Sequence, residues 1–377
     1  MKNKILLLIP IGLFLIVSGI NDIHRVTAPF PDTSGVKKIT LSFVGDIMCH
    51  TPQLDYARID SDSFDFKPVF REVKKYLSES DLTFGNLETV IGGSKFKFTG
   101  YPLFNSPIEL LEALNDSGFD ILFTSNNHSL DKGVDGIFNT INNISNYGMK
   151  AEGTYTSETG KDSLTIFEVG GFKLGILSYT YGLNGNFLSK KFLYAVNLID
   201  TTQIKYNLQK CKLLDTDINI IYFHFGEEYS HRPSKYQEEI VEKTFSYGAD
   251  IIVASHPHVV QPIRYYKKQN GNLDRGIVAY SLGNFISNQR WRFSDAGLIL
   301  NIELSKDIKD SVWISDVSII PTWVYKGNTG IKNEFVIVPS DTLLHPIPKY
   351  ILPSDKSKLL QSYNDVLSKY ELKNKSD

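Results

Sequence analysis

The sequence is poor in cysteine and has no large excess of charge of either sign. Cys49 and Cys211 are its only cysteines among 377 residues, so no framework of disulfide bonds can hold the fold together. The 40 basic and 42 acidic residues leave a formal net charge of −2, which gives no electrostatic attraction for nucleic acid. The chain must therefore be stabilised by a buried core, and its 42% of hydrophobic residues is ordinary for that purpose.

Long apolar runs are also missing, except at the N-terminus. Lys2 and Lys4 precede an apolar run over residues 5–20, a pattern typical of a signal peptide or a membrane anchor. The run is shorter than the roughly 20 residues of a spanning helix, and a buried helix is the third alternative. Signal and anchor both predict an exported protein, anchored at the outer face of the cytoplasmic membrane or else secreted or periplasmic. Residues 21–38 are polar, contain prolines and are expected to form a linker.

Strand-like and helix-like segments alternate from residue 39 onward. This alternation predicts an α/β fold in which helices pack on a buried sheet. The expected strands are 39–44, 82–84, 121–123, 172–178, 218–223, 251–253, 277–280, 313–320 and 334–338. The expected helices are 70–77, 106–116, 134–147, 235–247 and a polar one at 354–371.

Polar side chains follow several of these strands at the point where each strand ends. Sites in open α/β sheets form just beyond the carboxyl ends of the strands. Each side chain alone has a simpler explanation, such as a turn for Asp46 or a helix cap for Asn127, but together they form a ligand set suited to Mn, Zn, Fe or Mg. The pattern therefore predicts a metal site. Its members are Asp46, Glu88, Asn127, His128, His224, His256 and His258.

Five neighbouring residues are expected to contact substrate or to support the ligands. His50 either lends a nitrogen to a metal or is exposed. Asp131 and Asn284 either belong to the site or form local turns and caps. Glu228 either binds a ligand or pairs with Arg232. The five residues are His50, Asn86, Asp131, Glu228 and Asn284.

Six motifs in order make the sequence resemble the CapA-type capsule, or poly-γ-glutamate, biosynthesis proteins of the calcineurin-like metallophosphatase superfamily. The resemblance implies a four-layer sandwich, with two central mixed β-sheets flanked by helices, over residues 39–330. Residues 331–377 would then be a C-terminal extension with a helical tail. The motifs are Gly45-Asp46-Ile47-Met48, Asn86-Leu87-Glu88, Asn126-Asn127-His128 with Asp131 and Gly133, His224-Phe225-Gly226-Glu227-Glu228-Tyr229, His256-Pro257-His258 with Gln261, and Tyr280-Ser281-Leu282-Gly283-Asn284-Phe285.

The same resemblance implies roles for the residues of the site. Two divalent metal ions would be bridged by a carboxylate, and Glu88 stands where the bridging residue is usually an aspartate. Met48 stands where the superfamily has a ligand histidine. His128 resembles the general acid beside the leaving group. Asp46 and His258 would bind the first ion, and Asn127, His224 and His256 the second.

Two functions follow as expectations. The first is a metal-dependent hydrolase or transferase, outside the cytoplasmic membrane, acting on a phosphoester or an anionic polymer during capsule or poly-γ-glutamate synthesis. The second is a non-catalytic subunit that binds or exports polymer for a membrane capsule synthase. His128 favours the enzyme, because a binding module needs no general acid, whereas Met48 and the apolar N-terminus favour the subunit. A metal-stabilised domain with an unrelated role is the third alternative.

Overall fold

The computed structural model describes residues 35–267 and 272–372. The predicted signal or anchor at 1–20 and residues 21–34 of the predicted linker at 21–38 lie outside these residues, and the last two linker residues already belong to the first strand. The described chain from Val36 onward belongs to one compact unit. None of the helices within the described ranges is long and apolar enough to cross a membrane.

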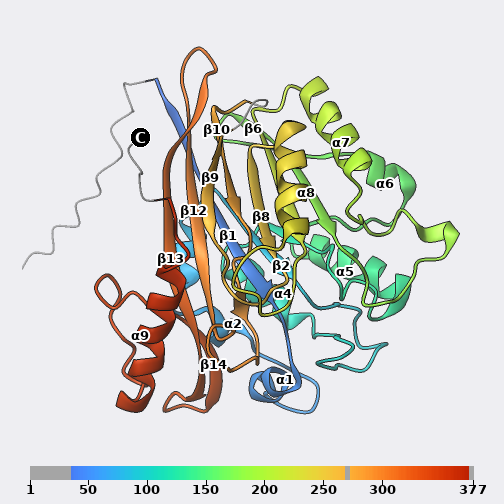
Figure 1. Ribbon diagram of the computed structural model, residues 1–377. Helices are drawn as coiled ribbons and strands as arrows, with labels where there is room; N and C mark the ends of the chain where they lie inside the picture. Colours follow the sequence, from blue (N-terminus) through green and yellow to red (C-terminus); the bar gives the residue numbers. More distant parts are fainter. Residues whose placement is uncertain (1–34, 268–271, 373–377) are drawn as a thin grey trace, which may run out of the picture. The chain divides into compact units, whose positions relative to one another are not determined.

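An eight-stranded mixed sheet forms one half of this unit (Figure 1). Its order is β14-β13-β12-β1-β2-β3-β4, with β11 also paired to β1. The strands β1 to β4 and β11 run parallel, whereas β12, β13 and β14 pair antiparallel. The strands are β1 (Lys37–Ile47), β2 (Leu82–Leu87), β3 (Ile121–Phe123), β4 (Lys150–Glu152), β11 (Asn284–Ile286), β12 (Ala296–Lys306), β13 (Val312–Asn328) and β14 (Asn333–Pro339).

A six-stranded mixed sheet forms the other half, in the order β5-β6-β7-β8-β10-β9. Its four central strands are parallel, and the two edge strands are antiparallel to their neighbours. The strands are β5 (Thr165–Val169), β6 (Phe172–Thr180), β7 (Ile218–His224), β8 (Ile251–Ser255), β9 (Ile263–Lys267) and β10 (Arg275–Ala279).

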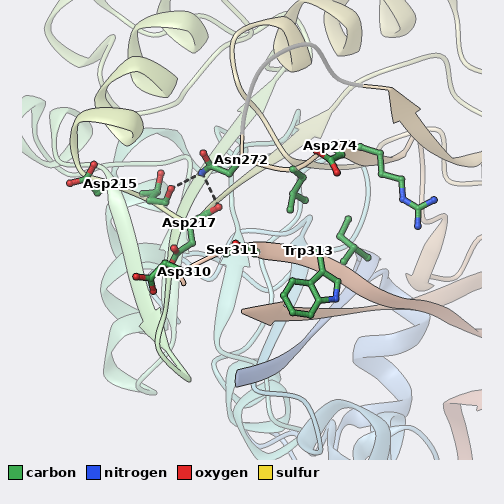
Figure 2. A pocket seen from close by; sticks show the side chains of 12 residues that line it. Asp215, Asp217, Asn272, Asp274, Asp310, Ser311 and Trp313 are labelled. Atoms are coloured by element: carbon green, nitrogen blue, oxygen red, sulfur yellow. Dashed lines mark hydrogen bonds between the residues drawn. The ribbon is translucent and has the colours of Figure 1, made fainter. Parts of the chain in front are cut away.

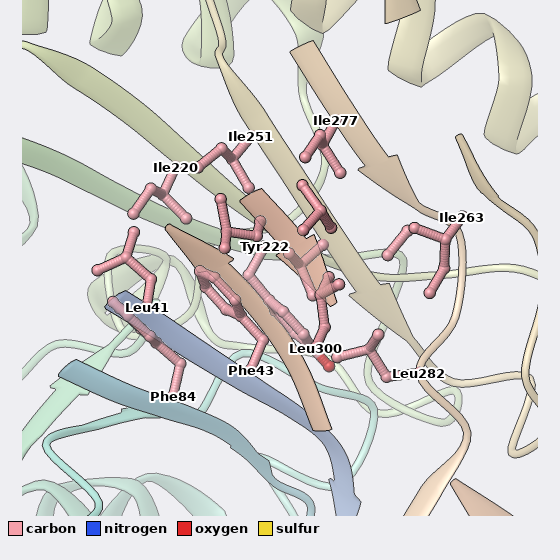
Figure 3. Close-up of a cluster of buried hydrophobic side chains, with 14 of the residues drawn as sticks. Leu41, Phe43, Phe84, Ile220, Tyr222, Ile251, Ile263, Ile277, Leu282 and Leu300 are labelled. Atoms are coloured by element: carbon pink, nitrogen blue, oxygen red, sulfur yellow. The ribbon is translucent and has the colours of Figure 1, made fainter. Parts of the chain in front are cut away.

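Apolar side chains from both sheets fill the space between them (Figure 3). Phe43 of β1 stacks on Phe84 of β2 with ring centroids 4.6 Å apart. Phe123 of the first sheet stacks on Tyr222 of the second at 4.2 Å. Strands that are buried on both faces have nearly continuous apolar sequences. This explains why short apolar runs in the sequence predict these strands.

Helices cover the outer face of each sheet. On the eight-stranded sheet they bury side chains such as Phe70 and Leu111 against strand residues such as Leu122. On the six-stranded sheet they bury side chains such as Leu208 and Phe245. The predicted four-layer sandwich is thereby confirmed. The first set is α1 (Thr51–Ala57), α2 (Lys67–Phe70), α3 (Lys74–Ser78), α4 (Glu109–Asp116) and α5 (Gly133–Asn146); the second is α7 (Thr201–Leu213) and α8 (Lys235–Ser246).

Two segments differ from the expectation. The helix expected at 70–77 is two short helices, α2 and α3, because the chain bends between them. The expected boundary at residue 330 falls in the turn between β13 and β14, so the segment beyond it supplies a strand of the same sheet. The tail helix is present as α9 (Pro353–Leu367) and contacts β12 and β13.

Candidate metal centre

The carboxyl ends of parallel strands from both sheets meet at the predicted site. Asp46 lies at the end of β1, and Glu88 directly follows β2. His224 is the last residue of β7, and His256 directly follows β8. These four side chains, together with Asn127, His128 and His258, are each no more than 4% exposed. The structure thus brings all seven of the predicted residues into one buried region.

Two groups of three residues place their ligand atoms within 4.8 Å of one another: Asp46 with Glu88 and His224, and Glu88 with His256 and His258. Glu88 belongs to both groups. Its Oε1 lies 3.7 Å from Nε2 of His224 and 3.9 Å from Nε2 of His258. A carboxylate between two sets of ligands is the arrangement that the resemblance implied for a bridging residue.

The composition of these groups differs in one respect from the expected division of ligands. They combine His224 with Asp46, and His256 with His258, whereas the expectation assigned His224 and His256 to one ion. Direct contacts nevertheless keep the expected partners adjacent. Nδ1 of His258 lies 2.9 Å from Oδ2 of Asp46, and Nε2 of His224 lies 2.9 Å from Oδ1 of Asn127.

The unpaired atoms of the cluster fit a divalent cation. Oε1 of Glu88 and Nδ1 of His256 are buried and have no hydrogen-bond partner among the described residues. Burial, followed by the nearby Asp46 carboxylate, raises the pKa of Glu88 well above its usual range. Burial lowers the pKa of His256 to about 3. Unpaired buried polar groups are costly, and a cation bound among them would satisfy both orphaned atoms and favour the ionised carboxylate.

Two asparagines orient the ligands from behind. Nδ2 of Asn86 donates to Oδ1 of Asp46 at 2.8 Å and lies 3.2 Å from Nδ1 of His224. Asn126 in turn donates from Nδ2 to Oδ1 of Asn86 at 3.2 Å. Such outer hydrogen bonds fix the orientation of ligand side chains. Asn86 therefore has the supporting position that was predicted for it.

The backbone is strained where the histidines enter the site. His256 has φ +108° and His258 has φ +57°, and Tyr229 on the adjoining loop has φ +62°. These are left-handed conformations that disfavour residues other than glycine, at about 1–3 kcal/mol each. The backbone N–H of Tyr229 donates to the carbonyl oxygen of Pro257 at 2.8 Å, which ties the two loops together. Strain of this kind is characteristic of functional sites.

A close backbone approach places Asp46. A Cβ atom on Gly45 would lie 1.9 Å from the carbonyl oxygen of Gly283. Since glycine has none, the N–H of Asp46 can donate to that oxygen at 3.0 Å. The contact holds β11 beside β1, with Asn284 in register with Asp46.

His128 lies beside the ligands but bonds to a different carboxylate. Its Nδ1 lies 2.8 Å from Oδ2 of Asp131, which also accepts the backbone N–H of Phe104 at 2.7 Å. The Phe104 ring packs edge-on against the imidazole, with centroids 4.7 Å apart. Nε2 of His128 has no hydrogen-bond partner within the described part of the chain. The imidazole is therefore oriented and has one nitrogen available for proton transfer, and Asp131 belongs to neither ligand group.

The remaining predicted residues have mixed outcomes. Nδ1 of His50 contacts Oε1 of Gln53 at 3.2 Å and the N–H of Asn288 at 3.3 Å, so His50 stands outside both ligand groups. Burial lowers the pKa of His50 to about 4. Asn284 is fully buried and its Oδ1 has no partner in the described ranges. Glu228 is exposed, and none of the ion pairs of the described residues joins it to Arg232.

Two residues of the site were not predicted. The ring of Tyr181 lies 4.6 Å from that of His256, and Asn184 accepts a hydrogen bond from Nδ2 of Asn127 at 3.1 Å. Both come just after β6, at its carboxyl end. The signal for them is their place just beyond the strand expected at 172–178, where open α/β sheets form their sites.

A cavity of about 790 Å³ lies elsewhere, at the opposite ends of the strands (Figure 2). It is bounded by the residues that precede β7 and β10 and by the turn before β13, including Asp217, Asn272 and Trp313. Nδ2 of Asn272 donates to the carbonyl oxygen of Asp217 at 2.8 Å, and Lys306 pairs with the Asp217 carboxylate at 2.9 Å. None of the predicted site residues lines this cavity.

The model of one protein family, described as "Bacterial capsule synthesis protein PGA_cap", matches residues 40–289. The chain belongs to this family. Membership confirms the resemblance drawn from the six motifs. The chain is 28% identical to "PGA biosynthesis protein CapA" of Bacillus subtilis, over 79% of this chain and 76% of that protein.

Further similarities are more distant or cover less of the relative. The chain is 29% identical to "Capsule biosynthesis protein CapA" of Bacillus anthracis, over 70% of this chain but only 63% of that protein. Among solved structures, the NAD nucleotidase of Haemophilus influenzae aligns with a TM-score of 0.48 and 12% identity, over 89% of this chain and 64% of that one.

Proposed function

We propose that this protein acts in capsule or poly-γ-glutamate synthesis, outside the cytoplasmic membrane, as a metal-dependent hydrolase or transferase on a phosphoester or an anionic polymer. The observation that carries the proposal is Glu88, whose buried and unpaired Oε1 lies between two groups of potential ligands. Export is supported by the lysines and the apolar run at the N-terminus. The names of the capsule biosynthesis relatives support the process.

In this proposal the residues of the site have distinct roles. Asp46, Glu88, Asn127, His224, His256 and His258 would hold two divalent cations, of Mn, Zn, Fe or Mg. When bound, such a pair polarises a phosphoester and supplies a nucleophilic hydroxide at neutral pH. His128 would protonate the leaving group from Nε2, and Asp131 would hold its other nitrogen in place.

Met48 supports a second candidate function. This side chain stands where a ligand histidine is expected, it is buried, and His50 is bonded elsewhere. A site with fewer ligands for its first ion would suit a non-catalytic subunit, one that binds or exports polymer together with membrane synthase subunits. The intact His128–Asp131 pair favours the enzyme.

Elemental analysis of the purified full chain, together with a phosphoesterase screen, tests the proposal. We expect about two divalent metal ions per chain and turnover of at least one phosphoester. Changing both His256 and His258 to Ala should remove bound metal, whereas the same change at His231 and His345, which lie outside both ligand groups, should not. Metal retained by the first double variant would refute the ligand assignment. Full metal loading without turnover of any ester would favour the binding subunit.

A further inference from the structure

Two exposed aromatic side chains border the candidate metal centre on the side of His258. The Tyr229 ring lies 6.1 Å from the His258 ring, and the Trp291 ring lies 5.1 Å from that of Tyr229. The side chains of Tyr229 and Trp291 are 39% and 51% exposed. Large aromatic residues gain most from burial, so two that stay exposed beside a buried polar cluster call for an explanation.

Contacts with other parts of the fold anchor the loops that carry the two rings. Tyr229 is fixed by its backbone bond to Pro257, and its hydroxyl accepts a hydrogen bond from Nε2 of Gln289 at 3.2 Å. Oε1 of Gln289 accepts in turn from Nδ2 of Asn284 at 2.9 Å. These contacts therefore connect the Tyr229 ring to Asn284 of β11, which is in register with Asp46 of β1.

The Trp291 loop is anchored separately, by the tail helix. Arg292 donates from Nε and Nη2 to the two carboxylate oxygens of Asp365 in α9, at 2.9 and 2.7 Å. Bidentate pairs of this kind fix geometry as well as adding energy. Preorganised side chains lose little entropy when a ligand binds, so the two rings form a surface suited to ligand binding.

The geometry favours a sugar ring on this surface. The two aromatic planes meet at 70°, so a flat base could stack on only one of them, whereas the C–H groups of a sugar point in several directions. Aromatic faces carry negative charge density and attract such C–H groups.

We infer that Tyr229 and Trp291 bind a sugar ring attached to the phosphoester whose phosphate lies at the metal centre. This inference rests on the proposed function and specifies its substrate class. It assigns to the site a glycosyl phosphate or a phosphate-linked saccharide.

Calorimetric titration of the full, Mn²⁺-loaded chain tests the inference. Glucose 1-phosphate and glycerol 1-phosphate carry the same phosphate monoester, but only the first has a ring. We expect the native chain to bind the ring-bearing ester about tenfold more tightly. In Trp291→Ala and Tyr229→Ala the ratio of the two affinities should fall to about one. Trp313→Ala is the matched control, because Trp313 is also partly exposed but lines the distant cavity (Figure 2).

Each outcome bears on the assignment. A ratio near one in the native chain, or a ratio that Trp291→Ala leaves unchanged, would overturn it. Uridine monophosphate serves as a base-bearing probe, and a dependence on Trp291 for this ligand alone would replace the sugar by a base. Because the ratio is measured from binding, absence of turnover would count against the proposed enzyme and not against the aromatic surface. Fluorescence quenching that Trp291→Phe abolishes provides a second readout in a conservative variant.

Discussion

His128 and Asp131 are joined by a contact of 2.8 Å between Nδ1 and Oδ2, on the turn that follows β3. This contact distinguishes His128 from the six predicted metal ligands, because Asp131, the carboxylate partner of His128, belongs to neither ligand group. One nitrogen of the imidazole is oriented, and the other faces no partner among the described residues. This arrangement suits a proton donor better than a ligand.

Replacement of His128 by Ala should abolish most turnover and leave the metal in place. General acid catalysis contributes about a hundredfold to ten-thousandfold in rate, and we expect a loss in kcat within that range. The measurement compares kcat and metal content per chain in the variant and the native protein. A variant that retains native turnover would remove His128 from the mechanism.

Asp131→Asn should lower kcat while preserving the fold. The amide oxygen can still accept the N–H of Phe104, but the carboxylate that faces His128 is lost, and a reduction of about tenfold to a hundredfold is expected. Asp131→Ala should also destabilise the protein by about 1–3 kcal/mol, because the buried N–H loses its acceptor. In a double-mutant cycle, Asp131→Asn should have little further effect once His128 is Ala. Additive effects would show that Asp131 acts independently of His128.

Glu152 should make the stability of the fold depend on pH. It is fully buried at the end of β4 and accepts hydrogen bonds from the hydroxyls of Tyr155 and Thr165, the latter in β5 of the other sheet. Burial raises the pKa of Glu152 from 4.5 to about 7. Because the pKa of Glu152 is higher in the folded protein than in the unfolded chain, this residue stabilises the fold fully only below the unfolded-state pKa of 4.5. That stabilisation is lost as the pH rises through the folded-state pKa of about 7.

The free energy of unfolding, measured in urea between pH 4.5 and 8.5, should show this loss. The contribution of Glu152 should amount to about 3 kcal/mol over that range. Glu152→Gln cannot ionise, so the difference in stability between the variant and the native chain should change with pH in the same window. A difference that is constant with pH would contradict the assignment.

Gly45→Ala should prevent the site from forming. The added Cβ would meet the carbonyl oxygen of Gly283 at 1.9 Å, so β1 and β11 must separate. We expect destabilisation on the order of 4 kcal/mol or more, seen as a large drop in the thermal unfolding temperature or as loss of soluble protein. Gly182→Ala is the matched control, because nothing lies within 4 Å of its added Cβ. Equal stability of the two variants would refute the close approach.

The sequence predicted the parallel strands and their site residues well because both leave local signals. Each buried strand is a short apolar run, and the polar residue after it is adjacent in the chain. The antiparallel strand β12 was missed, although it pairs with β1 over eight residues. The pairing with β1 joins residues more than 200 positions apart, so no nearby turn marks it. A short turn links β12 only to its other partner, β13.

Other features depend on contacts that the sequence does not display. Helix α7 buries Ile204, Leu208 and Cys211, but polar residues interrupt its apolar face, so its helical periodicity is weak. The placement of Trp291 beside Tyr229 depends on a loop between β11 and β12 that the tail helix anchors. Only the folded chain shows that α9 helps to position this edge of the site.

The candidate ligands come from both sheets, and this origin has a consequence for a chain whose two cysteines are buried and free. An ion held by Glu88 of one sheet and a histidine of the other would fasten the two halves together, as a disulfide does elsewhere. Binding to the folded state alone would then raise the melting temperature with the concentration of free metal. Preparations with different purification histories would differ in shelf life even though their sequences are identical.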